Sequence, residues 1–413
     1  MKAQRKNMER MEEYVEDYDY QSLQQFVSDS PWDHEALIKG IGKDVDALVG
    51  GTDSMLIIDE SCFAKKGKKS VGVARQWNGR LGKVDNSQVG VFAALSDGQG
   101  AGSLVDTRLY LPEQWTEDPE RCEGAKIPED KREHFTKRQL AWEMIKTAQS
   151  NGLRFGWVGL DSLYGNAPDL LRKIEDAGLR FTADVHRDQH IYTEDPAPYL
   201  PERTSKVGRP PSLLVTCSQS ERIDSFFKAK HKNELQKVFV RESTKGPIEV
   251  KASAVRVWLW DSQEQQARQW WAVCLIDGDT AERTFFLSNA PASTSLAELM
   301  RKHAGRYWIE RIFQDAKTSV GMADYQARGW IAWHHHMALV MLALLFLLKE
   351  RRIHADTLDL LSCQDIVALL DVYLPRSDRT KQAVVQSMNQ RHAKRRAAIE
   401  WARRKAIKKK RQT

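Results

Sequence analysis

An α/β fold is predicted for this chain of 413 residues. Two observations support the prediction. From about 55 to 96, short runs rich in Val, Ile, Leu and Phe are separated by turn residues, which is typical of an antiparallel strand meander. From 154 to 185, strand-like and helix-like segments alternate, which is typical of parallel pairing. The length exceeds the usual size of one hydrophobic core, so we expect a main domain with smaller modules.

The N-terminal residues are predicted to form a small helical module. Apolar residues from Leu23 to Leu48 recur at helical spacings. The stretch SDSPWD at 28–33 predicts a turn into a new helix, because Ser30 can cap the helix and Pro31 suits its first turn.

The next segments predict the order of a catalytic α/β core. Three strands in a meander are followed by a polar loop at 111–133, a helix, a strand, a helix and a strand. This is the order expected of a ribonuclease-H-like fold. The predicted strands are MLIIDE (55–60), SVGVARQW (70–77), QVGVFAALS (88–96), RFGWVGLD (154–161) and LRFTADV (179–185), and the predicted helices are 136–150 and 167–178.

The sequence pattern changes after residue 186 and indicates a mostly β insertion. Proline-bearing loops, DPAPYLPERTSKVGRPP, precede β-rich runs such as LQKVFVRES, VKASAVRVWLW, QWWAVCLI and RTFFLSNA. Helix returns at about 294. The longest apolar run, Met337 to Leu348, has twelve residues where a membrane span needs about 20, so we expect a buried helix. The predicted parts are 1–50, 51–186, 187–290, 291–350 and 351–413.

The charge distribution points to a polyanionic partner. From Arg391 to Arg411 there are eleven Lys or Arg residues and one acid, Glu400, so this stretch carries +10 and the remaining chain −3 of the total of +7. Nucleic acid is the commonest partner of such a basic tail. A solvated, fraying terminal helix is the alternative.

Composition also bounds the compartment and the class of protein. Hydrophobic residues make up 41% of the chain and charged residues 29%. This composition excludes global disorder, because burial of the apolar surface offsets the loss of chain entropy. The five cysteines lie far apart without a CxxC pair, which argues against a disulfide framework and a cysteine-based zinc site. The N-terminus has no apolar run suited to a signal peptide. We therefore expect a reducing, cytoplasmic location.

Two aspartates follow predicted strands. Asp59 ends the run LIIDE and Asp161 ends WVGLD. Because functional side chains gather where parallel strands end, these carboxylates are expected to share one site. Either aspartate alone is equally compatible with a turn or a helix cap.

A third carboxylate lies on a predicted helix. In HAGRYWIERIFQDAK, Arg306, Glu310 and Lys317 are spaced so that all three share one helical face. A surface ion-pair ladder is the alternative interpretation. Three carboxylates suit hard divalent cations, and two such ions can activate a nucleophile and stabilise the leaving oxygen in phosphoryl transfer. Arg306 and Lys317 are then expected to contact DNA phosphate.

Other polar and aromatic clusters are candidates for DNA contact. A basic loop after Asp59, made of Lys65, Lys66, Lys68 and Lys69, suits phosphate contact, with a solvated turn as the alternative. Tryptophans of the β insertion offer possible base stacking, with core packing as the alternative. These are Trp258, Trp260, Trp270 and Trp271. Consecutive His334, His335 and His336 point about 100° apart on a helix and do not converge on a metal.

The chain resembles the DDE transposases of bacterial insertion sequences, in the superfamily of insertion sequence four and its branch named for insertion sequence seven hundred and one. Five stretches carry the resemblance, which runs from about residue 30 to about 350. In order they are DESCFAKKGKKSVGVARQWNG, DNSQVGVF with LYLPEQWTEDPERC, DSLYGNAPDLLRKIEDAGLRF, RYWIERIFQDAK and YQARGWIAWHHHMALVMLAL.

The resemblance implies a site and an activity. It implies that Asp59, Asp161 and Glu310 bind Mg²⁺, with Mn²⁺ as a substitute, and that the protein cleaves transposon ends and transfers strands into target DNA. It further implies a DNA-binding N-terminal module, a homodimer on double-stranded DNA with no membrane contact, and a bacterial, nucleoid-associated location. The superfamily's Tyr, Arg, Glu, Lys signature fits Arg306, Glu310 and Lys317, but its tyrosine slot holds His303.

Three rival functions follow from the same residues. A metal-dependent nuclease of the same fold would hydrolyse DNA without joining it. A DNA-binding derivative without catalysis is opposed by the presence of all three carboxylates. A glycosidase acid pair gains no support from the basic tail.

Overall fold

The computed structural model describes most of the chain. Three of the predictions fall wholly or partly outside the described residues: the first part of the N-terminal module, the proline-bearing loop at 203–211, and Arg411 of the basic tail. The described residues are 6, 8, 20–202, 212–229, 234–243, 246–277, 282–358, 360–373 and 380–410.

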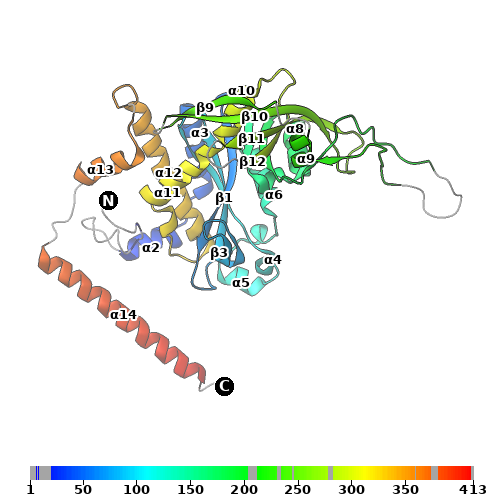
Figure 1. Cartoon of the computed structure of the whole chain (residues 1–413). Coiled ribbons are helices and arrows are strands. Elements are labelled where there is room, and N and C mark those ends of the chain that lie inside the picture. The colour runs from blue at the N-terminus through cyan, green and yellow to red at the C-terminus, as the bar shows by residue number, and fades with distance from the viewer. Residues whose placement is uncertain are drawn as a thin grey trace.

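One mixed sheet of ten strands runs through the molecule (Figure 1). Its order is β2-β3-β1-β5-β6-β12-β11-β10-β9, and β4 also pairs with β3. The pairs β1·β5 and β5·β6 are parallel, and the other pairs in the sheet are antiparallel. The strands are β1 (Met55–Ala64), β2 (Ala74–Asn78), β3 (Lys83–Ser96), β4 (Gly102–Leu109), β5 (Trp157–Leu160), β6 (Arg180–Val185), β9 (Gln236–Ser243), β10 (Gly246–Leu259), β11 (Arg268–Asp277) and β12 (Arg283–Ser288).

The mixed α/β class predicted from the sequence is confirmed. The meander has one more strand than predicted, because β4 lies between 97 and 110, where the sequence analysis assigned no element. Four strands from the insertion, β9 to β12, continue the central sheet beyond β6. A further small pair, β7 (His190–Ile191) and β8 (Glu221–Arg222), lies apart from it.

Helices cover this sheet and flank it (Figure 1). The predicted polar loop at 111–133 contains two short helices and a 3-10 turn at Glu129–Lys131. The helices are α2 (Tyr20–Ser28), α3 (His34–Val49), α4 (Glu113–Thr116), α5 (Pro119–Gly124), α6 (Lys137–Ser150), α7 (Ser162–Gly165), α8 (Pro168–Asp176), α9 (Ile223–Ala229), α10 (Leu296–Gly305), α11 (Tyr307–Ser319), α12 (Trp330–Ile353), α13 (Cys363–Tyr373) and α14 (Lys381–Lys410).

Local capping explains where two of these helices begin. The N-terminus of α6 carries a capping box, in which the Thr136 hydroxyl accepts from the Gln139 backbone and the Gln139 side chain accepts from Thr136. The prediction that Ser30 caps the next N-terminal helix is wrong. Asp33 caps α3 instead, since its carboxylate accepts from the backbone of Glu35 and Ala36.

Helix α12 is the central helix of the core, as the apolar run predicted. It is long and apolar enough to cross a membrane, but 67% of its most apolar window is buried inside the protein. Burial lowers the pKa of His334 to about 3 and that of His336 to about 4. The two ring nitrogens of His335 lie 3.0 and 3.1 Å from the carbonyls of Val27 and Trp32, so His335 connects α12 to α2 and to the segment before α3.

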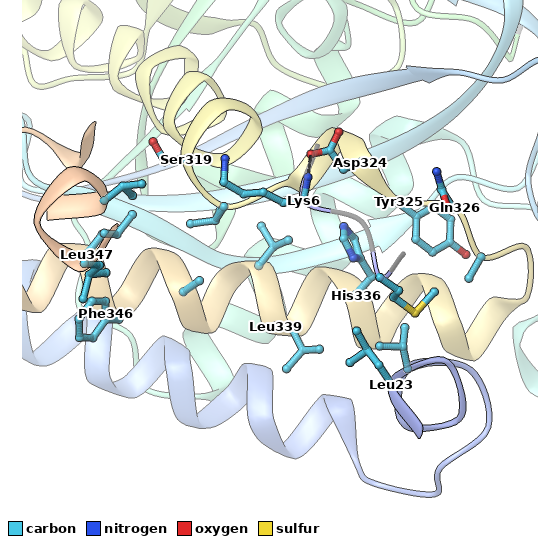
Figure 2. A pocket seen from close by; sticks show the side chains of 18 residues that line it. Lys6, Leu23, Ser319, Asp324, Tyr325, Gln326, His336, Leu339, Phe346 and Leu347 are labelled. Carbon is cyan, nitrogen blue, oxygen red and sulfur yellow. Dashed lines mark hydrogen bonds between the residues drawn. The ribbon is translucent and has the colours of Figure 1, made fainter. Parts of the chain in front are cut away.

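A mostly apolar cavity of about 320 Å³ lies against α12 (Figure 2). Leu23, Leu339, Phe346 and Leu347 line it, with His336 among the polar groups. None of the three predicted catalytic carboxylates lines this cavity, so the candidate site lies elsewhere.

Candidate active site

Parallel strand pairing places two aspartates side by side. Ile58 of β1 is paired with Leu160 of β5, and the next residues along the two strands are Asp59 and Asp161. The two carboxylates therefore leave neighbouring strands at the same level of the sheet, as the sequence predicted.

The setting of each aspartate differs in detail from the prediction. Asp59 does not end its strand, because β1 continues to Ala64 while still pairing with β3. Asp59 is the first residue of β1 beyond the part that pairs with β5. Asp161 caps the short helix α7, accepting from the backbone N–H groups of Leu163 at 2.9 Å and Tyr164 at 3.4 Å. Capping of α7 by Asp161 is therefore compatible with a site that Asp161 shares with Asp59.

Burial disfavours the charged forms of the two aspartates. Burial, and then the negative charge of Asp161, raise the pKa of Asp59 from 3.8 to about 7. Burial also raises the pKa of Asp161, against the opposing effect of the Tyr164 backbone N–H. The side chain of Tyr164 is fully buried, and its pKa is raised by burial and then by the charges of Glu60, Asp59 and Asp161. A cation is the natural complement of this pair.

Arg306 links the aspartates to Glu310. Burial lowers the pKa of Arg306, but the charges of Asp184, Asp59, Glu310 and Asp161 outweigh this effect and raise it. One guanidinium nitrogen of Arg306 lies 3.7 Å from Glu310 Oε1. The Glu310 side chain is 54% exposed on α11. The predicted single helix is interrupted at Arg306, where α10 ends and α11 begins.

A fourth carboxylate, Asp184, was missed by the sequence analysis. Ala183 of β6 is paired with Leu160 of β5, so Asp184 follows on the third parallel strand at the level of Asp161. Its carboxylate lies 2.6 Å from His303 Nε2 and 3.1 Å from Arg306 Nε. Burial alone would raise the pKa of Asp184, but His303 and Arg306 lower it. The run LRFTADV carried a signal for this residue, since its aspartate occupies the same place as the other two.

The residue in the tyrosine slot, His303, has a defined role in this arrangement. Its ring stacks on Phe286, with centroids 4.1 Å apart and planes at 10°. Its hydrogen bond to Asp184 leaves that carboxylate shared between His303 and Arg306. The pair therefore holds Arg306 beside the aspartates.

The donor set fits a hard divalent cation. Asp59 and Asp161 supply carboxylates on neighbouring strands whose pKa values are raised by burial, and Glu310 is exposed on α11. Within the described part of the chain, no three His, Cys, Asp or Glu side chains lie close enough together to hold a metal ion. Asp59, Asp161 and Glu310 are therefore not gathered into a three-carboxylate cluster in the described structure.

The basic loop after Asp59 is divided between two environments. Lys66, Lys68 and Lys69 are exposed and remain candidates for phosphate contact. Lys65 instead turns inward, donating to the Tyr325 carbonyl at 3.2 Å with its ammonium 4.7 Å from the Tyr325 ring centre. Burial lowers its pKa to about 8. Lys317 is part-buried, and burial lowers its pKa.

The four tryptophans of the insertion are engaged in packing and hydrogen bonds. Trp270 is 3% exposed and donates to Glu175 at 2.9 Å, so its ring presents no open face to a base. Trp271 donates to the Pro291 carbonyl and Trp260 to the Glu264 carbonyl. Trp258 is half-buried on β10. Core packing thus describes Trp270, and base stacking remains a prediction for the three part-exposed rings.

Removing the Asp184 carboxylate is expected to weaken both fold and site. Asp184→Asn deprives Arg306 and His303 of their shared anion, and we expect a loss of about 2 kcal/mol in the free energy of unfolding, measured by urea denaturation. The matched control is Asp169→Asn, an exposed residue 3.8 Å from Lys173, which should change stability by less than about 0.5 kcal/mol. Equal stability of the two variants would contradict the role given to Asp184.

Comparison with known proteins identifies the family. A family model described as "DDE superfamily endonuclease" matches residues 1–247, more than half of the chain. The protein therefore belongs to the DDE superfamily endonucleases, and the family predicted from the sequence is confirmed. Asp59 and Asp161 lie inside the matched range, and Glu310 lies outside it.

Two individual proteins are similar to this one. A probable transposase for insertion sequence element IS701, from Microchaete diplosiphon, is 31% identical over 174 residues, which is 41% of this chain and 42% of that relative. The chain thus spans less than half of the relative's length. A piggyBac transposase synaptic complex with hairpin DNA aligns over 81% of this chain and 56% of its own, at 11% identity and a TM-score of 0.37.

Proposed function

We propose that this protein is a DNA transposase that cleaves transposon ends and transfers the freed strands into target DNA. The observation that carries the proposal is the placement of Asp59 and Asp161 on neighbouring parallel strands, with Arg306 between them and Glu310. Family membership and the similarity to a probable insertion-sequence transposase support it. The strand order β4-β3-β1-β5-β6, with β1, β5 and β6 parallel, supports a ribonuclease-H-like catalytic domain.

In this proposal the carboxylates hold divalent metal. Asp59, Asp161 and Glu310 would bind Mg²⁺, which supplies activation of water or a 3′-hydroxyl and stabilisation of the leaving oxygen. Arg306, held by Asp184 at 3.1 Å, orients a DNA phosphate next to the carboxylates. Lys317 and the exposed lysines of the 65–69 loop extend the phosphate contacts. Cytoplasmic action on double-stranded DNA by a homodimer, which brings two ends together, belongs to the same proposal.

A joining assay tests the function. The purified full-length protein is mixed with Mg²⁺, a plasmid and a pre-cleaved duplex ending in the inverted repeats that flank the gene. We expect joined products that are absent when EDTA replaces Mg²⁺. Hydrolysis without any joined product would instead identify a nuclease of this family.

A further inference from the structure

A cluster of apolar side chains is exposed on the hairpin formed by β2 and β3. Trp77 is 57% exposed, Val84 50% and Leu81 44%. Trp77 and Val84 are direct cross-strand partners, so their side chains share one face of the hairpin, and Leu81 lies in the turn between the strands. Single exposed apolar residues are ordinary, whereas three of them gathered at one hairpin tip mark a contact surface.

Cationic side chains surround this apolar cluster. Arg75 and Arg80 are exposed, and Arg75 lies two residues before Trp77, on the same face of β2. Lys83 is also exposed but is paired with Asp85 at 3.2 Å. An apolar centre with arginines at its edge is complementary to nucleic acid, whose phosphates attract the cations while its bases accept apolar contact.

The hairpin adjoins the candidate active site. The Trp77 carbonyl lies 3.7 Å from Cys62 Sγ, and Cys62 is three residues beyond Asp59 on β1. Lys317 interacts electrostatically with Asp59 on one side and with Arg80 on the other. Lys317 is therefore near enough to both Asp59 and Arg80 for their charges to act on it, which places the hairpin turn close to the candidate site.

We propose that the β2–β3 hairpin is a DNA-binding wedge for the duplex that leaves the active site. Arg75 and Arg80 contact phosphates, and Trp77, Val84 and Leu81 press their apolar surface into the minor groove against the bases. Proteins that bind the minor groove combine arginines with apolar wedges in this way. The inference rests on the proposed function only in placing DNA across the carboxylates.

Binding measurements on full-length protein carrying Glu310→Gln test this proposal without any cleavage. The probe is a fluorescent duplex with the inverted-repeat sequence, titrated at several salt concentrations. Adding Trp77→Ala is expected to lower affinity about 10-fold. Adding Arg75→Ala with Arg80→Ala is expected to lower affinity and to reduce the slope of log affinity against log salt by about 2.

Two control variants match these changes on other surfaces. Tyr373→Ala removes an aromatic ring that is 79% exposed on α13, and Lys173→Ala removes a cation that is 49% exposed on α8. Both should bind DNA as the parent does, and thermal melting should show that every variant is folded.

Three outcomes would overturn the wedge. They are unchanged affinity and salt slope in the hairpin variants, no duplex binding by the Glu310→Gln parent, and weaker self-association at unchanged DNA affinity. The last would make the hairpin a protein contact. Failure of the proposed function is distinguishable, because the unsubstituted protein would then neither cleave nor join DNA while the hairpin variants still bound it more weakly.

Discussion

Glu310→Gln is expected to lower DNA cleavage by more than about 100-fold, because loss of a direct metal ligand exceeds the loss of about 10- to 100-fold seen for groups that only support ligands. DNA binding should remain within about twofold, since the substitution removes no cation that contacts phosphate. Stability should also be unchanged. The Glu310 side chain is 54% exposed, and its contact with Arg306, at 3.7 Å, is that of a weak surface pair.

A matched substitution separates the ligand role from a general effect of charge. Glu143 is 47% exposed on α6 and pairs with Lys146 at 2.8 Å, so Glu143→Gln removes a comparable helical ion pair away from the carboxylates. It should cleave DNA at the parental rate, measured as single-turnover nicking of a supercoiled plasmid in Mg²⁺. If Glu310→Gln cleaves as fast as Glu143→Gln, then Glu310 is not the third ligand, and its pairing with Arg306 is all that it contributes.

Sequence pattern identified two of the candidate carboxylates because period and turn signals are local. Asp59 and Asp161 each follow an apolar run of four or five residues, and parallel pairing then brings the two carboxylates to the same level of the sheet. The same logic applied to the third parallel strand would have found Asp184. It was passed over because no resemblance pointed to it and because its partners, His303 and Arg306, lie more than a hundred residues along the chain.

Side-chain environments that depend on residues far along the chain could not be predicted from the sequence. In the sequence, Lys65 is indistinguishable from the other three loop lysines. The carbonyl that accepts its hydrogen bond is 260 residues away. Trp270 reads as one of several aromatic residues of a β insertion, but its strand joins the central sheet and its ring becomes buried. Strand β4 was also not predicted, because the turn residues DGQG before it indicate a loop.

Asp59→Asn is expected to abolish cleavage and yet to stabilise the metal-free protein at pH 8. The pKa of Asp59 is about 7 in the folded protein against 3.8 ordinarily. Between about pH 4 and 7 the folded state keeps a proton that the unfolded state has lost, so stability falls as pH rises, by up to about 1.4 kcal/mol per pH unit. Asparagine carries no charge and removes this penalty. We expect the variant to exceed the parent by about 3 kcal/mol at pH 8.

Urea denaturation in EDTA at pH 5 and pH 8 measures this difference, which should shrink toward pH 4 as Asp59 becomes protonated in both states. Excess Mg²⁺ at pH 8 should then stabilise the parent and leave Asp59→Asn nearly unchanged, because a ligand that binds only the folded state adds stability that grows with the logarithm of its concentration above the dissociation constant. A variant that is less stable than the parent at pH 8 would mean that the short contact between Asp59 Oδ1 and the Glu60 N–H, at 2.7 Å, outweighs the cost of burying the charge. Gain of stability together with loss of cleavage is the combination expected of a carboxylate retained for chemistry at the expense of the fold.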